Sequence, residues 1–88
     1  MSVKTEVSQG QQFIDIEGNI YGLTSKDEGK HWRICKRKNV LWVALKGSEI
    51  GLKQIVGDFS FTSEESAQNM LNLLARRDKW KKLKLGRD

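Results

Sequence analysis

Apolar and polar residues alternate on both sides of a Gly-Asn dipeptide at positions 18–19, and this pattern constrains the fold more than any other in the chain. Alternation with a period of two is typical of a β-strand, and Gly-Asn between two such stretches is typical of a tight turn. If these two residues form the loop, Ile16 pairs with Tyr21. Two positions further from the turn, Ile14 pairs with Leu23, which places four apolar side chains on one face. The sequence therefore predicts a β-hairpin.

Further strands are expected after this hairpin. In residues 31–37 polar and apolar side chains alternate, so that Trp32 and Ile34 point toward the core. Residues 40–45 are apolar at every position, which is typical of a central strand or of one covered on both faces. Another strand is predicted within residues 53–61.

A helix is expected to follow the strands. Thr62 and Glu65 match a capping box, in which the threonine hydroxyl accepts a hydrogen bond from the third helical amide. Beyond them, the apolar residues with the spacing of one helical face are Ala67, Met70, Leu71 and Leu74. The helix is expected to continue to about Lys84. The predicted fold class is therefore α+β, an antiparallel sheet of four to five strands packed against one C-terminal helix.

The length and composition limit the domain organisation. A chain of 88 residues is expected to form one domain, which buries only about two-thirds of the surface that it exposes when unfolded. Residues 1–12 are polar and lack periodicity, which predicts a flexible N-terminal leader unless they dock as an edge strand. Residues 13–88 are then a single sheet-plus-helix domain with a basic C-terminal end.

The expected compartment follows from features that the sequence lacks. No apolar stretch approaches the roughly 18 residues that span a bilayer, and the polar N-terminus is unlike a signal peptide. The single cysteine, Cys35, has no partner for an internal disulfide. These features predict a cytoplasmic protein that does not act at a membrane.

The formal net charge of +5 is concentrated at the C-terminal end. Residues 76–88 hold seven of the sixteen Lys and Arg residues and two of the eleven acidic ones. Cations in such a segment release counterions when they neutralise phosphates, which favours nucleic acid as the ligand. A solvated helix end and an acidic protein partner are the alternatives. The candidate nucleic-acid-binding residues here, with Trp80 as a base-stacking aromatic, are Arg76, Arg77, Lys79, Trp80, Lys81, Lys82 and Lys84.

A second basic group lies in the predicted strand at residues 31–37 and just beside it. Its members are Lys30, Arg33, Lys36, Arg37 and Lys38, with no acidic residue among them. Arg33 and Arg37 share the strand face that points away from the core, where an arginine fork matches the two acceptors of guanine in a major groove. Trp32 and Trp42 are assigned to packing.

Catalytic and metal-binding patterns are not found in the sequence. His31 is the single histidine, and neither it nor Cys35 has the neighbours that a nucleophile, a general base or a metal site requires. No phosphate-binding glycine loop and no metal motif occurs. The protein is therefore expected to be no enzyme and to use no cofactor or metal.

Several short motifs follow one another along the chain: Tyr21-Gly22-Leu23, Gly29-Lys30, Trp32-Arg33-Ile34, Gly57-Asp58-Phe59, and Thr62 with Glu64-Glu65 and Ala67. Their order resembles the Apetala/ethylene-response-factor type DNA-binding domain. The resemblance implies a three-stranded antiparallel sheet on one helix that reads the major groove with Arg and Trp, and it implicates Arg33 and Arg37. The chain departs from that pattern in the inserted apolar residues 40–45, in an extra Phe61 and in fewer basic residues on the first strand.

The predicted order of elements is also similar to the Whirly and PUR-type single-stranded nucleic-acid binders. Their unit has four antiparallel strands followed by a helix, and such units commonly pair into dimers. A homodimer would cover residues 40–45, because one helix covers only one face of that apolar strand.

Together these features predict a small non-enzymatic protein that binds nucleic acid, DNA rather than RNA, through a basic sheet face and a basic helix end. The alternative is a small accessory or inhibitor protein, of phage or mobile-element kind. Such a protein would dock on a host protein through residues 40–45 or through the helix that carries Trp80.

Overall fold

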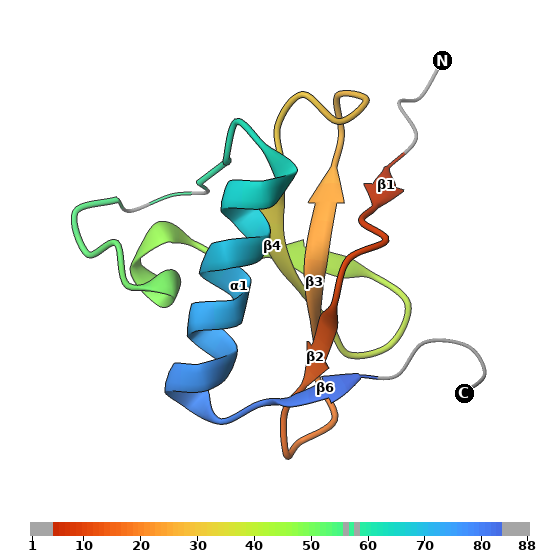
Figure 1. Cartoon of the computed structure of the whole chain (residues 1–88), viewed down its shortest axis with the longest axis vertical. Helices are drawn as coiled ribbons and strands as arrows, with labels where there is room; N and C mark the ends of the chain where they lie inside the picture. The colour runs from red at the N-terminus through yellow and green to blue at the C-terminus, as the bar shows by residue number, and fades with distance from the viewer. Residues whose placement is uncertain (1–4, 56, 58, 84–88) are drawn as a thin grey trace.

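The computed structural model describes residues 5–55, 57 and 59–83, so that the predicted site residue Lys84 lies outside the described part. In that part a six-stranded antiparallel sheet packs against one α-helix (Figure 1). The strands are β1 (Glu6–Val7), β2 (Gln12–Ile14), β3 (Ile20–Ser25), β4 (Arg33–Arg37), β5 (Trp42–Ala44) and β6 (Lys81–Leu83). The helix α1 spans Glu64–Asp78, and a short 3-10 helix, η1, spans Gly47–Ile50. The predicted α+β class, with an antiparallel sheet and a C-terminal helix, is confirmed.

The order of strands across the sheet is β5-β4-β3-β2-β6, and β1 pairs with the far end of β3. Strands β2 to β5 form a meander, whereas β6 returns from the end of α1 and pairs with β2 (Figure 1). Within the residues expected to be a leader, Glu6–Val7 pairs with β3, which is the edge-strand alternative that the sequence left open.

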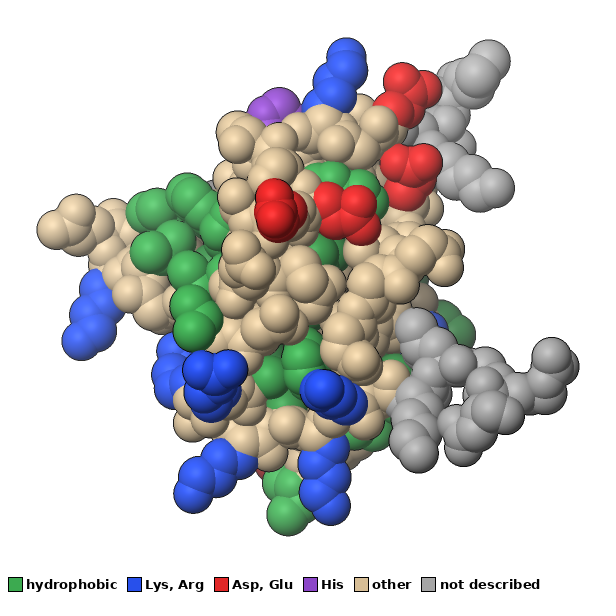
Figure 2. All heavy atoms as spheres, in the orientation of Figure 1, with side chains coloured by type: hydrophobic (Ala, Val, Ile, Leu, Met, Phe, Trp, Pro, Cys, Tyr) green, Lys and Arg blue, Asp and Glu red, His purple; other side chains and the backbone are tan. Residues whose placement is uncertain are grey.

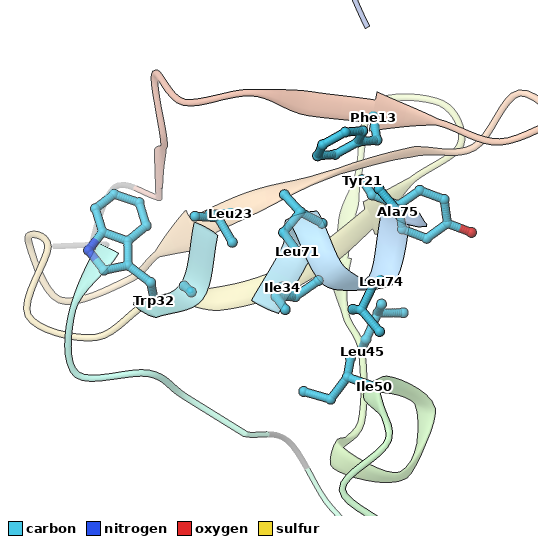
Figure 3. Close-up of a cluster of buried hydrophobic side chains, with 11 residues drawn as sticks. Phe13, Tyr21, Leu23, Trp32, Ile34, Leu45, Ile50, Leu71, Leu74 and Ala75 are labelled. Carbon is cyan, nitrogen blue, oxygen red and sulfur yellow. The ribbon is translucent and has the colours of Figure 1, made fainter. Parts of the chain in front are cut away.

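The core lies between α1 and the sheet face that the helix covers (Figure 3). Leu71 and Leu74 of the helix pack with Leu23 and Ile34 of the two central strands, and each of the four is at most 3% exposed. Burial of one such side chain contributes about 1.5–3 kcal/mol. The predicted apolar stripe of the helix is therefore confirmed, and Trp32 is buried as predicted.

The β2–β3 hairpin has a different register from the predicted one. Phe13 pairs with Tyr21 and Ile14 with Ile20, so the loop comprises residues 15–19 instead of two residues. This odd shift turns Phe13 toward the core in place of Ile14, because neighbouring residues of a strand face opposite sides. Ile16, predicted to be in the core, is fully exposed.

The carboxylate of Asp15 explains the longer loop. It accepts hydrogen bonds from the backbone amides of Glu17 and Asn19, both at 2.9 Å, and from the Asn19 side chain at 3.0 Å. A side chain that satisfies the amides of its own turn stabilises that turn against a tighter one. The position of one aspartate therefore outweighs the preference of Gly-Asn for a two-residue loop.

Strand β5 lies at the edge of the sheet, so the prediction of a central or doubly covered strand at residues 40–45 is wrong. It pairs with β4 on one side, no described strand pairs on the other, and the chain then turns into η1. Val40, Leu41 and Val43 are 80%, 76% and 61% exposed. An apolar run alone does not distinguish an edge strand from a central one.

The prediction of a strand within residues 53–61 is also wrong, since the described residues there form no strand. Phe61 forms an isolated bridge with Trp32, with two backbone hydrogen bonds of 2.7 and 2.8 Å. The preceding residues form turns after η1, and Leu52 and Phe59 pack against the edge of the core. The proposed bulge at Gly57 and Asp58 falls partly outside the described residues.

Both ends of α1 differ from the predicted ones. The N-cap is Ser63 instead of Thr62, and its hydroxyl accepts a hydrogen bond from the Ser66 amide at 3.1 Å. At the other end Lys79 adopts the left-handed conformation, with φ of 60°, and the helix stops at Asp78. The predicted continuation to about residue 84 is wrong, because the chain reverses there and forms β6.

Gly47 provides a test of how η1 packs. A methyl group on Gly47 would lie 2.6 Å from two side-chain carbons of Ile55, whereas one on Gly57 would meet nothing within 4 Å. We expect Gly47→Ala to lower the free energy of unfolding by about 1–3 kcal/mol, as overpacking does. Gly57→Ala should change it by no more than about 0.5 kcal/mol. Urea unfolding of both variants measures this, and equal midpoints would contradict the described packing.

Candidate nucleic-acid interface

The pairing registers bring part of each basic group of the sequence to the same end of the sheet. On the face that α1 covers, Lys36 pairs with Tyr21, Tyr21 with Phe13, and Phe13 with Lys82. Directly paired residues point to the same face. Lys36 of β4 and Lys82 of β6 therefore share one row, about 14 Å apart at about 4.8 Å per strand.

The neighbouring row lies on the opposite face and also has a cation on β4 and another on β6. Arg37 pairs with Ile20, Ile20 is opposite Ile14, and Ile14 pairs with Lys81. Arg37 also lies over the ring of Trp42, with its guanidinium carbon 5.0 Å from the ring centroid. Cations thus lie on β4 and on β6 at this end of the sheet, with residues of β3 and β2 between them.

The C-terminal turn of α1 adds further cations at this end, because β6 begins three residues after the helix stops. In Figure 2 most of the Lys and Arg side chains in view lie over the lower half, around the end of α1, and the Asp and Glu side chains gather over the upper half, where one basic side chain also projects. This separation creates a local positive potential. We call the following residues the basic end: Lys36, Arg37, Lys38, Arg76, Lys79, Lys81 and Lys82.

Not all the predicted site residues join the basic end. Lys30 is exposed in the β3–β4 loop, at the opposite end of β4 from Lys36. Arg33 is half-buried at the start of β4, opposite Thr24, and shares a face with Arg37 as predicted. The structure therefore divides the second basic group between the two ends of β4.

Arg77 is engaged within the protein. Its Nε and Nη2 donate to the two carboxylate oxygens of Asp78 at 2.9 and 2.8 Å, and Nη2 also donates to the Glu49 carbonyl at 3.4 Å. The hydrogen bond from Arg77 lowers the pKa of Asp78, which keeps the pair ionised. This arrangement neutralises Arg77, so we leave it out of the basic end.

Trp80, the predicted base-stacking residue, already stacks within the protein. Its ring lies 3.7 Å from the ring of Tyr21, at an interplanar angle of 8°. The Tyr21 hydroxyl donates to Asp15 at 2.8 Å, and burial together with this hydrogen bond raises the pKa of Tyr21. One face of the indole is therefore occupied, and the side chain is half-buried.

A groove of about 410 Å³ lies beside Trp80, between α1 and the β2–β6 edge. Its apolar lining comes from Phe13, Ala75 and Trp80, and its polar lining from Gln11, Asn72, Arg76 and Lys82. The charge pattern of the sequence gives no sign of Gln11 or Asn72. The spacing of Asn72 and Arg76, four residues apart on one helix face, is the one signal that could have indicated this site.

His31 and Cys35, the residue types most often used in catalysis, make contacts within the fold. His31 Nδ1 lies 2.6 Å from Asp27 Oδ2, and hydrogen bonds with His31 lower the pKa of Asp27 to about 2. Cys35 is buried, with its sulfur 2.9 Å from the Thr24 hydroxyl. Within the described residues no group of three or more His, Cys, Asp or Glu side chains could hold a metal ion.

Comparisons with known proteins return no relatives: no protein-family model, curated protein or solved structure matches the chain. Among the described residues no helix has both the length and the apolar character that crossing a membrane requires.

The Asp15 network predicts a specific sensitivity to acid. Burial disfavours the charged carboxylate, but hydrogen bonds from Asn19, Tyr21 and Glu17 outweigh it and lower the pKa of Asp15. The folded pKa lies below the unfolded value of about 3.9, so the network stabilises the fold above that pH and loses this effect as the pH falls through the folded value. We expect Asp15→Asn to reduce the loss of stability on acidification. It should also lower the free energy of unfolding at pH 7 by about 1–2 kcal/mol.

Thermal unfolding between about pH 7 and pH 3 measures this effect. Glu17→Gln is the matched control, because it removes one exposed carboxylate from the same loop. If the thermal midpoint falls by the same amount on acidification in the Asp15→Asn variant and in the wild type, the proposed role of Asp15 is contradicted.

Proposed function

We propose that this protein is a non-enzymatic nucleic-acid-binding domain that contacts phosphates through its basic end. One observation carries the proposal: the strand registers align Lys36 and Arg37 of β4 with Lys81 and Lys82 of β6. The two groups are far apart in the sequence and come to the same end of the sheet, with Lys36 and Lys82 on one face and Arg37 and Lys81 on the other. Each cation that neutralises a phosphate adds to an affinity that falls steeply with salt.

The acidic residues near the basic end do little to cancel its charge. Asp78 is paired with Arg77, and Asp15 accepts hydrogen bonds from its own loop and from Tyr21. Glu17 is exposed in the hairpin loop. Asp15 and Glu17 together bring two formal negative charges against the seven cations of the basic end, so a net positive charge remains to attract a polyanion.

The resemblance to the Apetala/ethylene-response-factor type domain favours DNA over RNA. That family reads DNA with Arg and Trp on its sheet. In this protein Arg33, Arg37 and Trp42 lie on the sheet face opposite α1. The similarity in element order to the Whirly and PUR-type proteins supports the same class of ligand and favours single strands.

Salt-dependent binding tests the proposal. We expect labelled DNA to bind in fluorescence anisotropy at about 50 mM salt and to lose affinity by orders of magnitude at about 200 mM. The double variant Lys36→Ala, Lys81→Ala should weaken binding about tenfold or more. On a single strand it should also lower the slope of log affinity against log salt by about 1.4, because two phosphate contacts are lost.

The matched control is Lys26→Ala, Lys30→Ala, which removes two exposed lysines from the β3–β4 loop at the other end of the sheet. It has the same net charge as the test variant and should retain most of the affinity. The proposal is wrong if the wild type does not bind DNA or RNA at low salt, or if both double variants lose affinity equally.

A second candidate function is docking on an acidic protein partner through the β5 edge. The observation that favours it is the exposure of Val40, Leu41 and Val43 beside Lys36 and Lys38, around a hollow of about 340 Å³. A second copy of the chain would bring like charges together here, whereas an acidic partner would complement them. A failure of nucleic-acid binding at low salt would make this the leading candidate.

A further inference from the structure

We propose that the groove between α1 and the β2–β6 edge receives one unpaired base of a nucleic-acid strand, an inference that rests on the proposed function. At about 410 Å³ the groove is within the range of small-molecule sites. It combines an aromatic wall, side-chain amides and two cations. These are the three kinds of group that contact an exposed base and its phosphates.

The aromatic wall is rigid before any ligand arrives. Trp80 rests on Tyr21 with nearly parallel rings, and Tyr21 is fixed by its hydrogen bond to Asp15. The part of Trp80 that lines the groove is therefore preorganised, and binding does not have to order it. A base that packs against Trp80 therefore meets a ring that is already fixed in place.

The amides on the rim are also held in place. Gln68 Nε2 donates to the Gln11 carbonyl at 3.1 Å and to Asn72 Oδ1 at 2.9 Å, which links the residue before β2 to α1 beside the groove. Asn72 Nδ2 and Gln11 Oε1 have no hydrogen-bond partner among the described residues. The rim thus offers one free donor and one free acceptor, as the edge of a base requires.

The charges of the groove select an anionic ligand. Arg76 from α1 and Lys82 from β6 line it, and its described lining contains no acidic side chain. The bases of a duplex are stacked inside the helix and cannot reach such a groove without being flipped out. The geometry therefore favours single strands, with the base in the groove and the flanking phosphates on Arg76 and Lys82.

The test separates base recognition from phosphate attraction. It uses two labelled strands of the same length and charge, oligothymidylate and an all-abasic deoxyribose phosphate strand, and a duplex of that length. We expect the wild type to bind oligothymidylate at low salt about tenfold or more tighter than the abasic strand, because base stacking on an aromatic side chain is lost. The duplex should also bind more weakly than oligothymidylate.

Asn72→Leu places a branched apolar side chain at the groove and removes the free donor. Asn72 is exposed on α1, so this change should leave the thermal midpoint nearly unchanged. Asn69→Leu is the matched control, since Asn69 is exposed on the same helix but lines a different hollow beside Glu65 and Gln68. We expect Asn72→Leu to lower the affinity for oligothymidylate about tenfold and the affinity for the abasic strand only slightly. Asn69→Leu should change neither affinity.

The outcomes distinguish the two proposals. Equal affinity of the wild type for both single strands, or an equal effect of Asn72→Leu on both, would overturn the inference about the groove and leave the basic end as the phosphate-binding surface. Duplex binding as tight as that of oligothymidylate would also overturn it. If none of the three probes binds at low salt, the proposed function itself fails.

Discussion

The stacked rings of Tyr21 and Trp80 hold the C-terminal part of the protein in place. Lys79 ends the helix in a left-handed conformation that costs about 1–2 kcal/mol for a residue with a side chain. The stack contributes about 0.5–1.5 kcal/mol beyond the burial of the rings, and the Trp80 amide donates to the Ala75 carbonyl at 2.8 Å. These contacts offset the strain and direct β6 toward β2. The position of the cations of β6 is therefore set by an aromatic contact.

Much of the fold could be predicted because its signals are periodic. The stripe that contains Leu71 and Leu74, and the alternation of Trp32 and Ile34, each identify a buried face without knowledge of distant residues. Register and strand position depend on single contacts instead. The loop that Asp15 stabilises shifts the hairpin by an odd number of residues, and no local pattern shows that residues 40–45 lie at an edge.

The sequence indicated which kinds of residue form the candidate site, but it did not indicate how they are arranged in space. Two basic groups are visible in the sequence, and their meeting depends on β6, which was expected to be helix. Lys79, Lys81 and Lys82 are themselves good helix formers. The sequence gives no stop signal either, since a left-handed Lys79 takes the place of the usual glycine. The groove requires Gln11 and Asn72 from two distant segments, a juxtaposition that only the tertiary structure creates.

The open edge of β5 affects how the protein behaves in concentrated solution. Unpaired backbone groups beside exposed Val40, Leu41 and Val43 form a template on which another extended chain can pair. Lys36 and Lys38 beside this edge oppose self-association through like-charge repulsion. At 1 M salt the screening length falls to about 3 Å, so this repulsion largely disappears. The ionic conditions that strip a polyanion from the basic end are therefore the ones that promote edge-to-edge aggregation.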